Sequence, residues 1–398
     1  MRIQLHIRSS WALAAAVLLP VAVHAAVPDY PVGTYPKFII AADLNKDGNE
    51  DIVTANYHDS NISILLGNGK GGFQTAVNYA VGAYPTGLSA GDFNGDGITD
   101  LAVANAINPH QSSCPSCGLQ GVSVLLGNGD GTFKPSVFYA AASGTAWVSV
   151  KDINADGKLD IIAAAWQADA VSVLLGNGDG TFQEPINTPV GSVPHSIAVA
   201  DINGDRKLDL AVGNMYSNNV EILIGNGDGT FTAGASYPVG LVPHDICHGD
   251  FNGDGKVDLA TANINSASMT VLLGNGDGTF QAGVSYPTNG VGPTSLYPAD
   301  FNGDGITDIA VANSGSLSTG LAMDGLAPSS TAGPSSAAIF IGNGDGTFQP
   351  AVTYNNGKGG NGIVATALTS NGLPDLVFCY FGSYVTVLLG NGDGTFSY

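Results

Sequence analysis

An acidic phrase of the form D-x-N-x-D-G-x-x-D recurs along the chain, and a glycine-rich phrase close to LLGNGDGTF follows each copy. The complete acidic copies start 49 residues apart from Asp152 to Asp201 and again to Asp250. That interval is too long for a solenoid coil and is typical of a propeller blade. The acidic copies start at Asp43, Asp92, Asp152, Asp201, Asp250 and Asp300, with a decayed copy at Ala367, and the glycine-rich copies end at Phe73, Phe133, Phe182, Phe231, Phe280, Phe348 and Phe396.

Each repeat unit contains short apolar or alternating runs separated by turn residues, with no useful helical period. In the fourth unit these runs are 195–200, 208–213, 220–224 and 231–237. Four strands in each unit and seven units predict an all-β fold, a seven-bladed β-propeller of four-stranded blades.

The two ends of the chain hold complementary parts of one unit. The first unit begins in mid-phrase at DYPVG, which elsewhere follows the glycine-rich phrase, and the last unit stops at 394–398. We therefore predict that the N-terminal strand completes the last blade and closes the ring, which hides strand edges. An open array of hairpins is the alternative.

Residues 1–25 resemble a secretory signal peptide, with Arg2 and Arg8 ahead of an apolar run at 11–23. Cleavage is expected after Ala25 or Ala26, and the apolar run is short for a membrane span. The sequence predicts a secreted protein, extracellular, at the cell surface or periplasmic, with residues 26–398 forming a single propeller domain and no membrane insertion.

The formal net charge is −21, from 33 acidic and 12 basic side chains. Such a surface disfavours nucleic acid and anionic membranes as partners. The acidic residues are concentrated in the repeated loops and glycine-rich turns.

The acidic loops have the donor pattern of a calcium site. Asp at positions 1, 5 and 9, Asn at position 3 and a backbone carbonyl at position 7 offer hard oxygens, and Gly at position 6 permits a sharp turn. Magnesium would need tighter octahedral geometry, and transition metals favour His or Cys. An EF-hand is disfavoured because its twelfth position should be Glu, whereas the second loop has Val103 there. A merely hydrophilic turn is the alternative. The predicted Ca²⁺ ligands are Asp43, Asn45, Asp47, Asn49 and Asp51; Asp92, Asn94, Asp96, Ile98 and Asp100; Asp152, Asn154, Asp156, Lys158 and Asp160; Asp201, Asn203, Asp205, Lys207 and Asp209; Asp250, Asn252, Asp254, Lys256 and Asp258; Asp300, Asn302, Asp304, Ile306 and Asp308.

The copies are unequal. The fourth loop has Arg206 at position 6, where positive φ would cost a non-glycine residue about 1 kcal/mol, so this site should be weaker or rearranged. In the seventh, Ala367, Thr369 and Asn371 replace ligands and only Asp375 remains. We predict five strong calcium sites, a weaker sixth in the fourth blade and none in the seventh. The GNGDG phrase is interpreted as a hairpin turn.

The repeated acidic loop between the first two strands of a blade resembles the FG-GAP or VCBS repeat, the propeller type found in integrin alpha subunits. The resemblance covers residues 27–398. It implies ions in the loops that join strands one and two, on the bottom face. Because the family includes adhesion proteins, lectin-like binders and accessory domains of enzymes, it implies the fold more firmly than the function.

Ligand binding is expected on the opposite, top face. Two insertions, 105–121 and 314–336, fall in loops between strands two and three, where aromatic residues also collect. Flat rings beside Asn and His suit a carbohydrate. The candidate ligand-binding residues are Tyr57, Trp166, Tyr216, Tyr380 and Tyr384, with Phe381 beside them, and His195 and His244.

Equivalent positions near the start of the inner strands are Lys37, Thr86, Ala146, His195, His244, Thr294 and Asn361. The two histidines, beside Asp245, could bind a transition metal or move protons, but a hydrogen-bonded pair at the channel mouth is favoured because no third ligand is evident. The orientation of His248 stays open.

The cysteines fit an exported protein. Cys114 and Cys117 are close enough in sequence for a disulfide within the first insertion, a zinc site being less favoured. Cys247 and Cys379, in blades five and seven, are interpreted as buried, inert thiols.

The preferred function is a secreted, calcium-stabilised binding module, monomeric, that recognises a carbohydrate or an extracellular protein through its top face. A polysaccharide lyase or hydrolase with Lys37, His195 and His244 at the channel mouth is the competing hypothesis, although no carboxylate pair for glycoside hydrolysis is placed. A cell-surface scaffold is the third.

Overall fold

The computed structural model describes residues 29–106, 120–316, 335–355, 360–380 and 382–397. The predicted signal peptide, Phe381, Cys114 and Cys117, and most of both insertions lie outside the described residues. Among the described residues, no helix has the length and apolar character needed to cross a bilayer.

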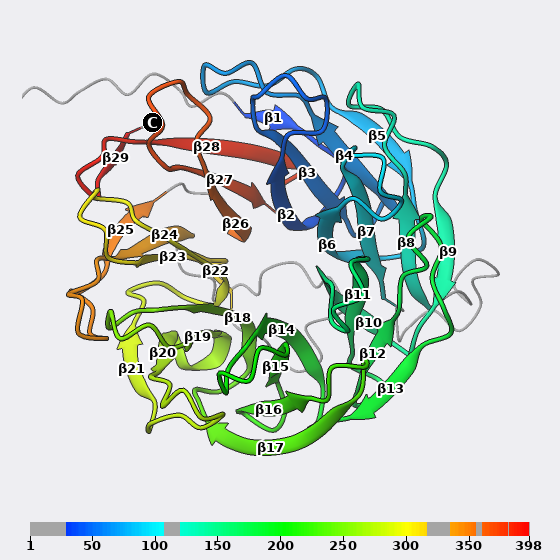
Figure 1. Ribbon diagram of the computed structural model, residues 1–398. Coiled ribbons are helices and arrows are strands. Elements are labelled where there is room, and N and C mark those ends of the chain that lie inside the picture. Colours follow the sequence, from blue (N-terminus) through cyan, green and yellow to red (C-terminus); the bar gives the residue numbers. More distant parts are fainter. Residues whose placement is uncertain (1–28, 107–119, 317–334, 356–359, 381, 398) are drawn as a thin grey trace, which may run out of the picture.

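Seven antiparallel sheets surround a central axis, as the sequence predicts (Figure 1). The innermost strands are β2 (Pro36–Ala42), β6 (Pro85–Gly91), β10 (Thr145–Lys151), β14 (Pro194–Ala200), β18 (Pro243–Gly249), β22 (Pro293–Ala299) and β26 (Gly360–Thr366). The second strands are β3 (Asp51–Asn56), β7 (Asp100–Asn105), β11 (Asp160–Ala165), β15 (Asp209–Asn214), β19 (Asp258–Asn263), β23 (Asp308–Asn313) and β27 (Asp375–Tyr380). The third strands are β4 (Asn61–Leu65), β8 (Gly121–Leu125), β12 (Ala170–Leu174), β16 (Asn219–Gly225), β20 (Ser268–Leu272), β24 (Ser336–Phe340) and β28 (Tyr384–Gly390). The outer strands are β5 (Val77–Ala80), β9 (Val137–Ala140), β13 (Ile186–Pro189), β17 (Phe231–Pro238), β21 (Val284–Pro287) and β25 (Val352–Asn355), and one 3-10 turn, η1 (Ile264–Ser266), follows β19.

The N-terminal strand closes the ring. β1 (Tyr30–Pro31) pairs antiparallel with β28, with Tyr30 opposite Val385, and β29 (Phe396–Ser397) pairs with the other end of β28. Figure 1 shows the blue β1 beside the red β28. The predicted closure of the last blade by the N-terminus is therefore confirmed.

The core consists of apolar layers between adjacent blades. The second strand of every blade is buried over its whole length. In one such layer Val53 and Ile64 of the first blade pack with Leu101 and Val103 of the second. Burial of these faces removes apolar area from water all around the ring.

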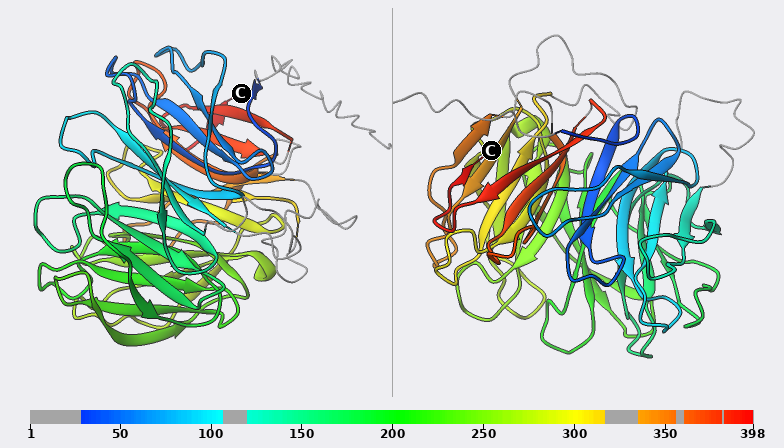
Figure 2. Two further views of the ribbon diagram at one scale, coloured as in Figure 1. Left: turned by 90° about the vertical axis from the view of Figure 1, so that its right-hand side faces the viewer. Right: turned by 90° about the horizontal axis from the view of Figure 1, so that it is seen from above.

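Strands run between two faces of the ring (Figure 2). We call the face with the acidic loops and GNGDG turns the bottom face, and the face where the inner strands begin the top face. The acidic loops with the predicted calcium ligands therefore lie on the bottom face, and the loops with the candidate aromatic residues lie on the opposite, top face.

A bulge marks the top of every inner strand, where the pairing register with the second strand shifts. In blade four the preceding Val193 has φ +57°, which is strained for a β-branched residue. Its carbonyl accepts a hydrogen bond from the Met215 backbone N–H at 2.9 Å, and five other blades repeat this bond. Because a bulge redirects a side chain, the second residue of each inner strand is held at the mouth of the channel. Positive φ at this position occurs at Tyr35, Tyr84, Gly144, Val193, Val242 and Gly292.

Candidate functional site

The acidic loops on the bottom face hold their side-chain oxygens with their own backbone. In blade five the Asp250 carboxylate accepts the Gly255 N–H at 2.8 Å, and Asn252 Oδ1 accepts the Asp254 N–H at 3.0 Å. Asp254 Oδ1 accepts the Lys256 N–H at 3.0 Å. The oxygens at positions 1, 3 and 5 thus have fixed directions. The same pattern recurs in the other five complete loops.

Arg206 does not rearrange the fourth loop. It has φ +69°, and its N–H donates to Asp201 Oδ2 at 2.8 Å, as glycine does elsewhere. The expected positive φ is present, so a backbone cost of about 1 kcal/mol is built into this loop. Whether calcium binds it more weakly stays a prediction.

The ninth residue of each loop acts as a buried brace. Asp258 is fully buried, and its two oxygens accept the Phe251 N–H at 2.9 Å and the Gly274 N–H at 2.7 Å. Burial raises the pKa of Asp258, and the two backbone donors oppose that rise. All seven blades have this carboxylate, including the seventh, where Asp375 accepts the Leu368 and Gly390 N–H groups. The brace therefore does not depend on a complete acidic loop.

The donor chemistry of the six complete loops fits calcium, since hard oxygens stand at alternating positions in a loop with a sharp turn. Among the described residues, no three or more His, Cys, Asp and Glu side chains are gathered as a metal-binding group. A calcium ion in these loops would therefore rely on the Asn amide and a backbone carbonyl as well as carboxylates. The Lys256 ammonium lies 3.2 Å from Asp254 Oδ2 and forms an exposed ion pair with this position-5 carboxylate.

The GNGDG phrases form turns, as expected. Asn128 N–H donates to the Thr132 carbonyl, and the Asp130 side chain accepts the Thr132 N–H at 2.9 Å. The last glycine of the phrase also joins blades, because the Gly180 N–H donates to the Phe93 carbonyl in the preceding blade at 3.0 Å.

His195 and His244 lie side by side at the top of the channel, with their ring planes tilted by 39° and each ring hydrogen-bonded to a backbone carbonyl. Their ring centroids lie 4.0 Å apart. His195 Nδ1 lies 2.6 Å from the His244 carbonyl, and His244 Nδ1 lies 2.7 Å from the Thr294 carbonyl. Since a carbonyl only accepts, both rings carry the proton on Nδ1. Burial lowers the pKa of His195 to about 4 and holds that of His244 well below its usual value.

Donation from a mouth side chain to a backbone carbonyl of the next blade continues around half of the mouth. Thr294 Oγ1 donates to the Gly360 carbonyl at 3.1 Å, and Asn361 Nδ2 donates to the Pro36 carbonyl at 2.8 Å. Side chains therefore link blades four, five, six, seven and one in succession. The other half differs, because the Thr86 hydroxyl is buried without a hydrogen-bond partner and Ala146 has none to offer.

Lys37, at the mouth position of the first blade, contacts two aromatic rings. Its Nζ lies 5.5 Å from the Tyr35 ring centroid and 5.3 Å from that of Tyr57, within cation–π range. The seven residues of the mouth enclose a cavity of about 20 Å³, room for about one water molecule. No sugar ring fits between Lys37, His195 and His244 in this arrangement.

Three of the expected ligand-binding aromatic residues are buried. Tyr57 and Tyr380 are 1% exposed and Trp166 is 5% exposed, so in this structure these three rings offer no open surface to a ligand. Each directly follows or ends a second strand, where the chain folds back, as the Trp166 N–H bond to the Gly144 carbonyl at 2.9 Å shows. Tyr216, at 45%, and Tyr384, at 39%, are exposed as expected.

Leu241 is an exposed residue that the sequence analysis did not select. It is 54% exposed in the link between β17 and β18, where Val242 N–H donates to Asn218 Oδ1 at 2.8 Å. This bond joins the link to the loop that carries Tyr216. The sequence does mark Leu241 as unusual, because the equivalent position in the links before β2, β6, β10 and β14 holds Thr, Ala or Ser.

Cys247 and Cys379 are free thiols that do not pair. Cys379 is buried and Cys247 is half-buried. Burial raises the pKa of Cys379 to about 12 and raises that of Cys247 well above its usual value, so both are inert as nucleophiles.

Comparison with known families identifies the repeat. The model of the FG-GAP-like repeat matches residues 43–103, 116–163, 152–212 and 250–311, and that of the FG-GAP repeat matches 193–237. These matches span more than half of the chain. The protein belongs to the FG-GAP repeat family, and its architecture is the seven-bladed propeller.

Solved structures with the same fold have diverse roles. An Agrocybe aegerita lectin that specifically recognises non-reducing terminal N-acetylglucosamine is 19% identical over 91% of this chain and 87% of its own, with a TM-score of 0.54. BBS1N, solved in complex with ARL6DN, is 11% identical over 92% and 97%, with a TM-score of 0.59. A putative 6-phosphogluconolactonase from Bacteroides uniformis is 12% identical over 92% and 93%, with a TM-score of 0.58. No curated protein matches the chain. At these identities the likeness concerns the fold alone.

Proposed function

We propose that this protein is a secreted binding module that recognises a carbohydrate or an extracellular protein through its top face. The exposed side chains of Tyr216 and Leu241, on two top-face segments tied together through Asn218, carry the proposal. Exposed aromatic and apolar groups among hydrogen-bonding side chains suit a sugar face or a protein partner. The lectin that recognises N-acetylglucosamine and BBS1N, solved in complex with ARL6DN, share this fold, which supports a carbohydrate or a protein as the partner.

Polar groups surround this pair. Ser192 and Ser217 are joined by a hydrogen bond of 2.9 Å, and Leu241 N–H donates to Ser266 Oγ at 2.7 Å. Hydroxyl and amide groups beside a flat ring are the combination that orients a sugar. We define the top-face patch as Tyr216, Leu241, Ser192, Ser217 and Ser266.

Calcium has a structural role in this proposal. The loops at Asp43, Asp92, Asp152, Asp201, Asp250 and Asp300 would hold the ions through the side chains at positions 1, 3, 5 and 9 and the carbonyl at position 7. A bound ion would neutralise the clustered carboxylates. The loops lie on the face opposite the patch, so the ions would support the ring without touching the ligand.

The polysaccharide-degrading alternative is less well supported. His195 and His244 are neutral at pH 7 and already donate to carbonyls, in a cavity the size of about one water molecule. General acid–base catalysis needs a group within reach of the substrate.

A glycan array tests the proposal, with folded mature protein in calcium. We expect selective binding that Tyr216→Ala abolishes or weakens at least tenfold, because stacking on the ring is lost. Val284→Ala is the matched control, since Val284 is 54% exposed on outer strand β21, outside the patch, and should bind like wild type. A blank array excludes the carbohydrate and leaves a protein partner or a scaffold role. Binding that Tyr216→Ala leaves unchanged contradicts the assignment of the patch.

A further inference from the structure

The central channel is divided into two spaces by an aromatic pair. Phe38 and Trp147 meet edge to face, with ring centroids 4.6 Å apart and planes at 72°. Above them is the mouth cavity of about 20 Å³, and below them is a chamber of about 500 Å³ that both rings also line. We call this second space the lower chamber. Its volume lies in the range of small-molecule sites.

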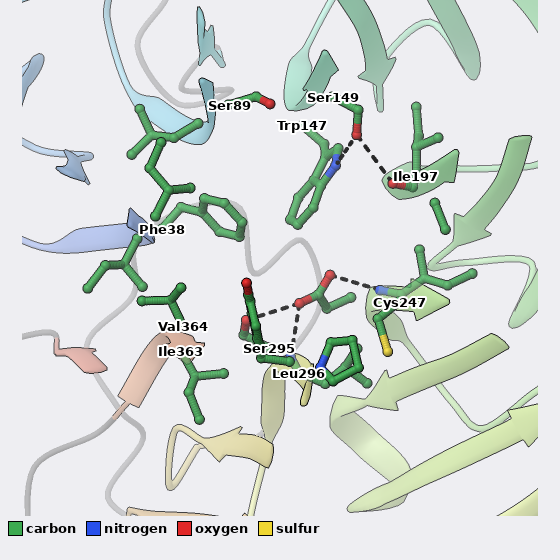
Figure 3. A pocket seen from close by; sticks show the side chains of 18 of the residues that line it. Phe38, Ser89, Trp147, Ser149, Ile197, Cys247, Ser295, Leu296, Ile363 and Val364 are labelled. Carbon is green, nitrogen blue, oxygen red and sulfur yellow. Dashed lines mark hydrogen bonds between the residues drawn. The ribbon is translucent and has the colours of Figure 1, made fainter. Parts of the chain in front are cut away.

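The walls of the lower chamber are mostly apolar. Six of the seven inner strands contribute an aliphatic side chain from their fourth position, and further small or apolar residues follow toward the bottom face. Figure 3 shows Phe38 and Trp147 facing Ser295 and Leu296 across this space. At the bottom ends of β10 and β18 stand the exposed Lys151 and His248, so His248 does point into the channel. The fourth-position residues are Ile39, Leu88, Ile197, Ile246, Leu296 and Ile363.

Asp245 is the one carboxylate among the residues that line this chamber. It is 4% exposed and accepts hydrogen bonds from Ser295 Oγ at 3.0 Å and from the Leu296 and Ile246 N–H groups at 3.0 and 2.8 Å. Within the described parts of the chain, no Lys, Arg or His forms an ion pair with it. Burial raises its pKa to about 7. Its hydrogen bonds are satisfied, but its charge has no counter-ion.

We propose that the lower chamber binds a small organic ammonium ion, with the nitrogen beside the Asp245 carboxylate and the apolar body against Phe38, Trp147 and the aliphatic walls. A cation is what the buried carboxylate lacks, and the rings of Phe38 and Trp147 offer apolar contact to the body of the ligand. The space below offers apolar contact for a hydrocarbon or aromatic body. This site is separate from the top-face patch.

The charge of the molecule favours the same sign of ligand. The formal net charge is −21, and acidic loops surround the bottom opening of the channel. Such a field concentrates cations at the opening. The Lys151 ammonium at the rim acts against this and favours an anion, whereas burial lowers the pKa of His248 and keeps it neutral at pH 8, so the preferred charge of the ligand is the decisive observable.

Calorimetric titration of the calcium-loaded full protein at pH 8 tests this with three probes of one shape: phenethylamine, 2-phenylethanol and 3-phenylpropanoate. At this pH the amine is protonated and Asp245 is mostly ionised. We expect phenethylamine to bind at least tenfold more tightly than the alcohol, and the carboxylate to show no binding. Equal or tighter binding of the alcohol or of 3-phenylpropanoate, or no binding of phenethylamine, would overturn the proposal.

Asp245→Asn keeps the shape of the side chain and removes the charge, and it should weaken phenethylamine binding at least tenfold. Thr86→Val, which alters the cavity above the aromatic pair, is the matched control and should bind the amine like wild type. Unchanged binding in a folded Asp245→Asn protein refutes the site. If that variant does not fold, the three-probe series with wild type still decides, and neither result depends on the glycan array.

Discussion

The two faces of the ring are built on opposite plans. On the bottom face the loop bonds recur in six blades, and the brace recurs in all seven, as with Asp258 and with Asp375 in the otherwise decayed seventh loop. On the top face the equivalent mouth positions hold Lys, Thr, Ala, His, His, Thr and Asn; four of these side chains bond to a carbonyl of the next blade, Lys37 lies over aromatic rings, and Thr86 has no hydrogen-bond partner. The repeated face therefore holds the architecture, and the varied face is where ligand recognition can differ between propellers.

Removal of calcium should have the largest effect on this comparison. A ligand that binds only the folded state adds about 2.7 kcal/mol at a hundred times its dissociation constant, and six loops would add several such contributions. We expect chelation to lower the melting temperature markedly. Differential scanning calorimetry with and without a chelator measures this change. A melt that is indifferent to chelator contradicts the calcium assignment.

Loss of a brace should cost about 3 kcal/mol or more, because it leaves two buried N–H groups without an acceptor. Asp375→Ala should show this cost equally with and without calcium, since its loop lacks the other ligands. Denaturant unfolding measures it. The matched control is Asp254→Ala, which removes an exposed position-5 carboxylate and should cost nothing in chelator but destabilise the protein in calcium. A cost below about 1 kcal/mol for Asp375→Ala would refute the brace.

Acidification should lower the free energy of unfolding, because the buried histidines of the top face become protonated more readily in the unfolded state. The folded pKa of His195, about 4, is below the unfolded value of 6.5, so the unfolded state binds more protons between these values. This stability is present above pH 6.5 and is lost as the pH falls toward 4. His195→Gln should flatten the profile by on the order of 2 kcal/mol relative to wild type. Parallel unfolding curves for the two proteins from pH 7 to pH 4 would contradict the neutral pair.

The smallest effect compares two threonines at equivalent mouth positions. Thr294→Val removes a hydroxyl that donates to the Gly360 carbonyl and should cost about 1 kcal/mol. Thr86→Val removes a buried hydroxyl without a partner and should be neutral or stabilising by a similar amount. Urea unfolding gives the free energy of unfolding of each variant relative to wild type. Equal losses for Thr294→Val and Thr86→Val would show that the hydrogen bond of Thr294 adds no stability.

Much of the fold could be predicted from the sequence because the repeat makes each strand recur at a fixed distance. In blade four the expected run 195–200 is β14 (Pro194–Ala200), and 231–237 is β17 (Phe231–Pro238). The closing strand followed from the partial unit at each end. Local turn chemistry and alternation are sufficient for these features.

The site was harder to predict, for a physical reason at the top of each blade. A positive φ and a bulge at the start of the inner strand change which way the next side chains point, and neither is evident from alternation. The same backbone bonds fold Tyr57 and Trp166 inward, although their position in a loop suggested exposure. Asp245 accepts hydrogen bonds from Ser295 and Leu296 of β22, and the chamber it lines is closed by Phe38 of β2 and Trp147 of β10, which sequence spacing does not bring together.

The number of calcium ions bound per chain tests the account of the two faces most directly. Equilibrium dialysis of metal-stripped protein, followed by metal analysis, should find six ions in wild type. Asp250→Ala should bind five, and Asp375→Ala, in the seventh blade, should still bind six. No bound calcium in wild type, or the loss of one ion in Asp375→Ala, would contradict the claim that six loops bind calcium and that the seventh blade keeps only the brace.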